Sequence, residues 1–314
     1  HMMISGHLVN KYILSLSQFD QKSLTSLFRT TQKIIQLIKN NKCSDVLKGS
    51  VIALLFFEPS TRTHNSFSSA IQRLGAGVIG IQDTSVTSMS KGESFEDTIQ
   101  MYSNYAELIV IRHPEEGSAQ RAADAASIPV INAGDGGNEH PTQGLLDLYT
   151  IHARFGRLSR LKVLIVGDLR YGRTVKSLLR GLSLYTGNTA YLLAPKELRL
   201  DPELLKNLKK KIKIVEIVSE EQIPGDCDVW YWTRIQKERF SSKKLSKQMK
   251  NSFIVTTKLL SKKGNKQMII MHPLPRVGEI AVEVDSDPRA FYFKQAKNGL
   301  YVRMALLASI LNKL

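Results

Sequence analysis

Cysteine is nearly absent from the sequence, and this scarcity argues against two kinds of site. Cys43 and Cys227 are the only two cysteines in 314 residues, and neither has a second cysteine close by in the chain. We therefore expect neither a disulfide framework nor a thiolate zinc site within the chain. Both cysteines are interpreted as small hydrophobic residues that lie buried or half-buried.

Long apolar segments are lacking as well. No apolar run reaches the length of about 18 residues that a membrane-spanning helix needs, and no charged-then-apolar signal segment opens the chain. His1 and Met2 precede a second methionine and are interpreted as a remnant of tag cleavage. Hydrophobic residues nevertheless make up 42% of the sequence, enough for the cores of two domains. We expect a soluble cytoplasmic protein that makes no membrane contact.

Acidic residues are outnumbered by basic ones, which suggests an anionic partner. The formal net charge is +16, and much of the excess lies in the short lysine runs Lys209–Lys211, Lys243–Lys244 and Lys262–Lys263. Aromatic residues are not interleaved with these runs, as a stacking platform for nucleic acid would require. We interpret the runs as solvated faces, predict no nucleic-acid binding, and expect small anionic substrates instead.

Short β-rich runs alternate with helical patterns along most of the chain. The runs that read as buried strands are Val51–Phe57, Leu108–Arg112, Lys162–Gly167, Thr189–Ala194, Asp228–Trp232 and Gln267–Met271. The segments with apolar periodicity near 3.6 are Lys22–Lys39, Arg62–Leu74, Pro141–Phe155, Gly172–Tyr185 and a terminal helix around Phe293–Leu311. This alternation predicts an α/β protein whose parallel sheets are flanked by helices, with active residues beyond the carboxyl ends of strands.

The segment Phe56–Thr63, FFEPSTRT, carries the strongest chemical signal. An apolar strand ends at Phe57, and Ser60–Thr63 opens a helix. Backbone amides at a helix N-terminus, hydroxyl groups and a guanidinium together favour a phosphate site. The competing interpretation is an ordinary N-cap beside a surface arginine. A Walker loop is excluded because the sequence contains no GxxxxGK[ST].

Several further motifs, in the same order, resemble those of the transcarbamoylase family. Besides STRT they are Ser66-Phe67, Arg73-Leu74-Gly75, Lys91-Gly92-Glu93, Arg112-His113-Pro114, His140-Pro141-Thr142-Gln143 and His272-Pro273-Leu274-Pro275-Arg276. The resemblance implies a carbamoyl-phosphate domain, residues 3–142, completed by a terminal helix at 293–314 that returns to it. Residues 143–292 would then form the domain that binds the second substrate. No metal or organic cofactor is implied.

The second substrate is decided by segments that differ within the family. Ornithine-using members are expected to carry a cysteine in an HCLP loop and an SMG segment, whereas this chain has HPLPR and no SMG. It has instead the segment Thr233–Arg239, TRIQKER, which resembles an aspartate-binding TRxQxER. An acceptor with two carboxylates also needs several arginines. The resemblance thus implies transfer of a carbamoyl group from carbamoyl phosphate to L-aspartate, an early step of de novo pyrimidine biosynthesis. The alternatives are an ornithine-type transcarbamoylase and a non-catalytic basic binding protein on the same fold.

Roles for individual residues follow from the resemblance alone. The residues implied to bind carbamoyl phosphate are Ser60, Thr61, Arg62, Thr63, Arg112, His140, Gln143, Pro273 and Leu274. Among them Arg62 would stabilise the departing phosphate, and Thr63, Arg112 and His140 would polarise the carbamoyl carbonyl. The residues implied to bind aspartate are Arg173, Arg234, Gln236 and Leu274. Glu58 and Arg239 would form charged links across the cleft.

The polar loop Thr84–Glu93 has a separate expected role. In the family, a serine and a lysine of this loop enter the active site of a neighbouring subunit. Lys91 fits the KGE motif, whereas Ser85, Ser88 and Ser90 compete for the serine position, of which we choose Ser88. This implies a homotrimer with shared active sites, with a separate regulatory chain as a further possible partner. The same stretch, considered alone, reads as a flexible polar loop.

Overall fold

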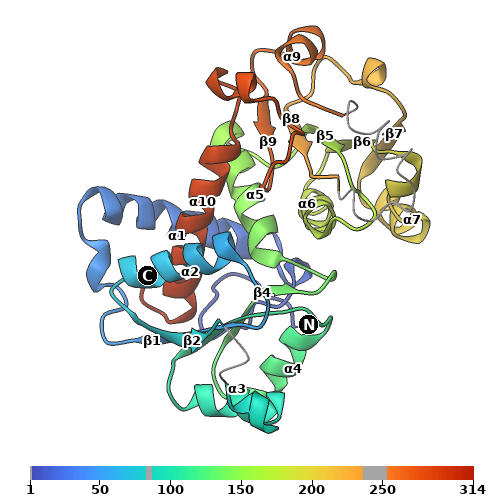
Figure 1. Ribbon diagram of the computed structural model, residues 1–314. Coiled ribbons are helices and arrows are strands. Elements are labelled where there is room, and N and C mark those ends of the chain that lie inside the picture. Colours follow the sequence, from blue (N-terminus) through green and yellow to red (C-terminus); the bar gives the residue numbers. More distant parts are fainter. Residues whose placement is uncertain (1, 83–86, 236–252) are drawn as a thin grey trace. The chain divides into compact units, whose positions relative to one another are not determined.

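The computed structural model describes residues 2–82, 87–235 and 253–314, which form two compact units (Figure 1). Unit 1 contains the chain up to Tyr149 together with Lys297–Leu314, and unit 2 is Thr150–Ala296. The divisions fall inside helices α5 (Pro141–Phe155) and α10 (Tyr292–Ile310). The domain boundaries predicted from the sequence, after residues 142 and 292, precede these divisions in the same two helices.

Unit 1 is built on a four-stranded parallel sheet. Its strands, in spatial order, are β2 (Gly77–Ile81), β1 (Val51–Phe56), β3 (Leu108–His113) and β4 (Val130–Asp135). The two central strands are runs of branched apolar residues, as expected for strands covered on both faces. Their carboxyl ends lie side by side, with Phe56 opposite Arg112.

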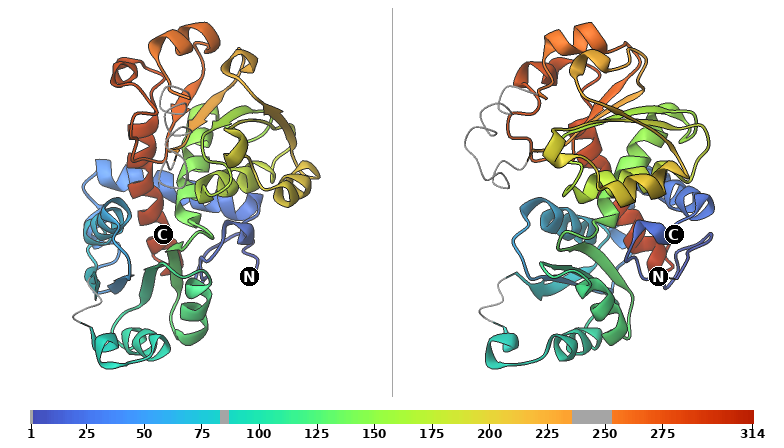
Figure 2. Two further views of the ribbon diagram at one scale, coloured as in Figure 1. Left: turned by 45° about the vertical axis from the view of Figure 1, so that its right-hand side comes forward. Right: turned by 90° about the vertical axis from the view of Figure 1, so that its right-hand side faces the viewer.

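Helices cover both faces of this sheet. Ala53 and Leu55 of β1 pack on the face that carries α3 (Phe95–Ser103) and α4 (Ser118–Ala125). Helix α2 (Thr61–Arg73) lies on the opposite side (Figure 2). Because side chains alternate along a strand, one apolar run serves both layers.

The two ends of the chain are both part of unit 1. Helix α1 (Gln21–Lys39) starts at a capping box, in which the Asp20 side chain accepts from the backbone of Ser23 and the Ser23 hydroxyl accepts in return. At the other end, the Asn10 N–H donates to the carbonyl of Ile310 at 2.9 Å. The prediction that the terminal helix returns to the first domain is therefore confirmed.

Unit 2 contains a five-stranded parallel sheet. The strands, in spatial order, are β7 (Lys213–Ile217), β6 (Thr189–Leu193), β5 (Lys162–Val166), β8 (Val229–Trp232) and β9 (Ile269–Met271). Its helices include α6 (Arg173–Leu182), α7 (Pro202–Lys209) and α9 (Thr257–Lys263). Trp230 and Trp232 share one face of β8, with ring centroids 5.6 Å apart, and pack in one core with Leu259 and Leu260 of α9.

The predicted class, two parallel-sheet domains flanked by helices, is confirmed. Strands β2, β4 and β7 were not predicted, and each is an edge strand of its sheet. Cys43 is half-buried and Cys227 buried, both are free thiols, and burial raises the pKa of Cys227 to about 12. Within the described ranges, no helix has the length and apolarity needed to cross a membrane.

Candidate active site

The first candidate subsite lies where β1 ends and α2 begins. Ser60 is the N-cap residue of α2, with extended backbone (φ −155°, ψ 101°), and its side chain makes no capping hydrogen bond. No acidic residue lies in the first turn. A helix N-terminus of this kind attracts anions through its first N–H groups and the positive end of its dipole. Ser60–Thr63, the segment expected to hold a phosphate, is therefore at an anion-attracting helix end.

Two guanidinium groups add positive charge to the same end of α2. Burial, together with repulsion by Arg112, holds the pKa of Arg62 below its ordinary value. Arg112 is fixed by two hydrogen bonds, from Nε to Glu58 Oε1 at 2.9 Å and from Nη1 to the carbonyl of Ala133 at 3.3 Å. Its side chain is only 14% exposed. Two cations that repel each other are both stabilised when an anion such as phosphate binds near them.

His140 connects the start of α5 to the start of α2. Its Nε2 lies 3.4 Å from Thr63 Oγ1, and its Nδ1 lies 3.5 Å from Thr142 Oγ1. All three side chains are buried. One turn further along α5, Gln143 Nε2 donates to Asp147 Oδ1 at 2.9 Å. The structure thus brings Thr63 of α2 together with His140, the residue directly before α5.

Unit 2 carries the residues expected to bind the second substrate. Strands β5 and β8 are parallel neighbours, with Val166 opposite Trp232. Arg173 opens α6 after β5, Arg234 follows β8, and both residues are half-buried. Because the carboxyl ends of adjacent parallel strands share one edge of the sheet, both guanidinium groups come from the same edge.

A glycine permits the turn that follows β5. Gly167 has φ +126°, and a Cβ on it would lie 2.1 Å from Thr233 Oγ1. That hydroxyl donates to the Val166 carbonyl at 3.0 Å and accepts from the Asp168 N–H at 3.1 Å. Thr233 therefore ties the ends of β5 and β8 together, and it fixes the two loops that carry the arginines.

The segment after β9 forms a braced turn. Leu274 has φ +58° and precedes a cis peptide bond. The Leu274 N–H donates to His272 Nδ1 at 2.8 Å, so the ring proton is on Nε2, which donates to Glu279 Oε2 at 3.2 Å. The Val277 N–H donates to the same oxygen at 2.8 Å. Burial raises the pKa of Glu279, but these hydrogen bonds outweigh burial and hold it below its ordinary value. Pro273 and Leu274, expected to bind carbamoyl phosphate, lie on this turn.

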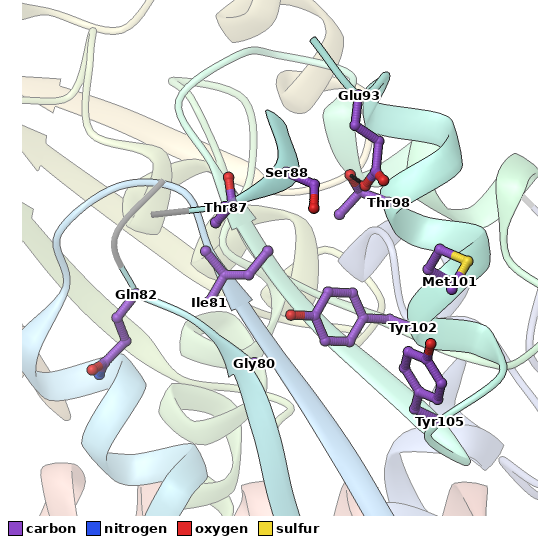
Figure 3. Close-up of a pocket in the computed structure, with 10 residues that line it drawn as sticks. All are labelled: Gly80, Ile81, Gln82, Thr87, Ser88, Glu93, Thr98, Met101, Tyr102 and Tyr105. Carbon is purple, nitrogen blue, oxygen red and sulfur yellow. Dashed lines mark hydrogen bonds between the residues drawn. The ribbon is translucent and has the colours of Figure 1, made fainter. Parts of the chain in front are cut away.

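The loop expected to serve a neighbouring subunit is described from Thr87 onward. Ser88–Lys91 forms a short 3-10 helix that ends at Gly92 in the left-handed region (φ +96°). Ser88 and Lys91 are exposed. Ser88 lines a pocket of about 590 Å³ together with residues of β2 and α3, including Tyr102 (Figure 3). Ser88 and Lys91 are therefore on the surface of unit 1.

Several residues named from the sequence lie outside the described part of the chain, among them the candidate site residues Ser85, Gln236 and Arg239 and the lysine run Lys243–Lys244. Glu58, expected to link across the cleft, pairs with Arg112 within its own unit. In residues 2–82, 87–235 and 253–314, no three His, Cys, Asp or Glu side chains are grouped closely enough to hold a metal ion.

One buried cation was missed by the sequence prediction. Arg303 of α10 is 5% exposed, and it donates to Ser66 Oγ at 3.0 Å and to Thr142 Oγ1 at 3.2 Å. Burial lowers the pKa of Arg303 to about 10, so the side chain stays charged at neutral pH. The signal that could have found it is a single charged residue inside the apolar segment YVRMALLASI of the terminal helix.

Family models match nearly the whole chain. Residues 11–153 match the family described as aspartate/ornithine carbamoyltransferase, carbamoyl-P binding domain, and residues 159–310 match its Asp/Orn binding domain. The aspartate carbamoyltransferase catalytic subunit of Methanobrevibacter smithii is 45% identical over 302 residues, which are 96% of this chain and 95% of that protein. The multifunctional protein CAD of Squalus acanthias is 46% identical over 97% of this chain, which spans 14% of that protein.

Solved structures of similar proteins agree with this match. The catalytic subunit of aspartate transcarbamoylase from M. jannaschii has a TM-score of 0.91 and 44% identity, covering 96% of this chain and 98% of that one. Aspartate transcarbamoylase from Trypanosoma cruzi, in complex with carbamoyl phosphate and aspartate, has a TM-score of 0.88 and 35% identity, covering 97% and 98%.

Proposed function

The chain belongs to the aspartate/ornithine carbamoyltransferase family, and we infer that it transfers the carbamoyl group of carbamoyl phosphate to the amine of L-aspartate. The products are N-carbamoyl-L-aspartate and phosphate, which places the reaction early in de novo pyrimidine biosynthesis. The observation that carries this assignment is the pair Arg173 and Arg234 at one edge of the unit 2 sheet. Two guanidinium forks suit an acceptor with two carboxylates. Aspartate as the acceptor is supported by the names of the relatives. Gln236 is the third side chain proposed to bind it, because it belongs to the TRIQ segment.

The phosphate of carbamoyl phosphate binds at the N-terminus of α2. Ser60, Thr61 and Thr63 supply hydroxyl groups, and the first backbone amides of the helix point outward along its axis. Arg62 stabilises the charge that builds up on the departing phosphate. Its lowered pKa supports this role, because its charge gains most when an anion arrives.

The carbamoyl carbonyl is polarised by Thr63, Arg112 and His140. The first and last are 3.4 Å apart, and Arg112 is held in place by Glu58. Donors fixed before the reaction stabilise a developing oxyanion without reorganisation, and losing one costs on the order of 10²- to 10³-fold in kcat. Gln143, with the carbonyls of Pro273 and Leu274, orients the carbamoyl amine, and Leu274 also contributes to the binding of aspartate.

The chemistry is acyl transfer in two steps. The lone pair of the aspartate amine forms a bond to the carbamoyl carbon, which gives a tetrahedral intermediate with negative charge on its oxygen. The bond from carbon to the phosphate oxygen then breaks, phosphate leaves with the electron pair, and the proton lost by the nitrogen ends on the phosphate. Phosphate is a good leaving group, so positioning and charge stabilisation suffice and no enzyme-bound acyl intermediate is needed.

An ornithine-type activity is the alternative within the family. A phosphate-release assay with aspartate and with ornithine separates the two. We expect turnover with aspartate and none above background with ornithine, because the HPLPR turn has no cysteine and the acceptor edge carries two cations. Comparable or faster turnover with ornithine would remove the aspartate assignment.

We further propose a homotrimer in which Ser88 and Lys91 serve the neighbouring subunit. Exposed apolar side chains next to this loop support the proposal, since Met101 and Tyr105 are 42% and 57% exposed. Met101 and Tyr105 also line the pocket of Figure 3. Apolar surface of this kind, continuous with a loop assigned to another subunit, suits a second copy of the chain.

A cytoplasmic location, the absence of nucleic-acid binding and a separate regulatory chain stay predictions. The prediction that the protein binds no nucleic acid depends on reading the lysine runs as solvated faces. One run starts at Lys209, the last residue of the short helix α7. Its surface position is typical of a solvated face.

A further inference from the structure

A chain of polar side chains runs from the interior of unit 1 to His140. It starts at Arg303 of α10, continues to Thr142 of α5 at 3.2 Å, and reaches His140 Nδ1 3.5 Å further on. On the other side of the imidazole ring, Nε2 lies 3.4 Å from Thr63 Oγ1. All four residues are buried. The donor-to-acceptor direction of the hydrogen bonds in such a chain is set by a member that can only donate or only accept.

Arg303 is that member. A guanidinium has five N–H donors and no acceptor, and it cannot be deprotonated under ordinary conditions. The Thr142 oxygen must therefore accept from Arg303 Nη2, which leaves the hydroxyl proton of Thr142 to be donated elsewhere. His140 Nδ1 lies within its reach, and it can accept that proton only if Nδ1 itself carries none. A neutral imidazole that accepts at Nδ1 carries its proton at Nε2.

We propose that Arg303 is a positioning residue that acts through Thr142 to fix His140 as the tautomer protonated at Nε2. This inference rests on the proposed function, in which His140 donates to the carbamoyl oxygen. Nε2 is the nitrogen that faces Thr63, another of the donors assigned to that oxygen. With the opposite tautomer, Nε2 would present a lone pair to the oxyanion, and the interaction would be repulsive.

The surroundings of Arg303 are built to hold a charged side chain in the interior. Its guanidinium carbon lies 5.3 Å from the centroid of the Phe67 ring, and Nη1 donates to Ser66 Oγ at 3.0 Å. Gly299, one turn earlier on α10, leaves the space that the side chain needs, since a Cβ there would lie 2.7 Å from Nη1. Attraction by Asp147 partly offsets the cost of burial, which lowers the pKa of Arg303. A buried cation kept at this cost is expected to have a specific task.

The tautomer can be measured without substrate. In the full chain labelled with 15N-histidine, protonated and unprotonated ring nitrogens give separate signals, and His140→Asn identifies those of His140. At a pH well above the ordinary histidine pKa of about 6.5, we expect Nε2 of His140 to be protonated. Proton on Nδ1 in the wild-type protein, whether as the neutral tautomer or as imidazolium, would overturn the proposal.

Two variants test the cause. Thr142→Val removes the hydroxyl that donates to His140 Nδ1 with little change of shape. Arg303→Met removes the guanidinium that makes the Thr142 oxygen an acceptor and so directs its proton to His140. In each variant we expect a substantial fraction of the protein to carry the His140 proton on Nδ1. The kcat should fall about twofold if the two tautomers are equally populated, and about 100-fold if the Nε2–H donor is almost lost. Thr142→Ser should restore the wild-type tautomer and most of the rate. Ser66→Ala is the matched control, because it also removes a hydrogen bond from Arg303 but lies outside the chain to His140.

The outcomes separate this inference from the proposed function. If Thr142→Val folds, as a thermal melt will show, and keeps His140 protonated at Nε2, the proposal fails whatever happens to Arg303→Met. If the wild-type protein shows the expected tautomer but does not turn over aspartate, the structural inference stands and the assigned reaction fails.

Discussion

Arg62 offers the sharpest test of the phosphate site, because its roles in catalysis and in stability have opposite signs. In the folded protein, burial and repulsion by Arg112 lower the pKa of its guanidinium. Its charge is thus less favourable in the folded state than in the unfolded chain, where the pKa is ordinary. Arg62→Ala removes this unfavourable term, so the folded protein should lose no stability. Catalysis loses the cation assigned to the leaving phosphate.

The size of the catalytic loss follows from the chemistry of the leaving group. Removing one preorganised donor to developing charge costs about 3–4 kcal/mol, or roughly 10²- to 10³-fold in kcat. A guanidinium lies at the upper end of that range, because its hydrogen bonds are charge-assisted. The lysine of Arg62→Lys keeps the charge but not the planar fork, and it should recover only part of the rate.

Steady-state rates at saturating substrates and a thermal melt, made on the same preparation, decide the matter. We expect a kcat lowered at least 100-fold with an unchanged or slightly higher melting midpoint. A variant that keeps more than about a tenth of the wild-type rate, 1.4 kcal/mol or less in barrier, would refute the role. A lower melting midpoint would refute the electrostatic reasoning separately.

Three further predictions concern the turn, the strand ends and the assembly. The pKa of Glu279 is lowered in the folded protein, so its carboxylate stabilises the fold at pH values above the unfolded pKa of about 4.3. This stabilisation is lost as the pH falls through the folded pKa. Glu279→Gln should therefore lower the free energy of unfolding by about 1.5–3 kcal/mol at neutral pH, and by less in acid. Gly167→Ala should destabilise by about 2–4 kcal/mol in denaturant titrations, because φ is +126° and a Cβ would lie 2.1 Å from Thr233 Oγ1. Mixed Lys91→Ala and His140→Ala chains, each inactive alone, should regain part of the activity if sites are shared between subunits.

Each of these has its own control. A cost of Glu279→Gln that is independent of pH would contradict the assigned charge. Gly225→Ala is the comparison for Gly167, since nothing lies within 4 Å of a Cβ there, and equal effects would remove the steric argument. For the hybrids, subunit exchange must first be verified by mass. Verified mixed oligomers that show no activity would mean that Lys91 serves the active site of its own chain.

The sequence predicted the fold where apolar runs are long and failed at three of the four edge strands, β2, β4 and β7, whereas the fourth, β9, was predicted. The run VIALLFF was predicted as Val51–Phe57 and forms β1, a central strand. The segment Gly77–Ile81 was missed because two glycines interrupt it and most of it is exposed, as an edge position allows. In β4, the polar residues Asn132 and Asp135 interrupt the apolar pattern of the sequence. Both are buried, and their side chains are hydrogen-bonded to each other at 3.2 Å.

The candidate site was predictable where a motif is contiguous and unpredictable where distant segments meet. Ser60–Thr63 could be assigned to a phosphate because strand, hydroxyls and helix start follow one another in sequence. The shared role of Thr63 and His140, which are 77 positions apart, came from the resemblance and not from any pattern, and the structure adds their contact. Arg303 could not be placed at all, because its partner Ser66 is 237 positions away.

The central claim is that the carbamoyl carbon becomes bonded to the nitrogen of aspartate. The most direct measurement follows [13C]carbamoyl phosphate and [15N]aspartate by NMR in the presence of the protein. We predict a new carbonyl signal split by coupling between 13C and 15N, growing in step with released phosphate. Release of phosphate without any coupled signal, with the label recovered as bicarbonate or cyanate, would contradict the assignment.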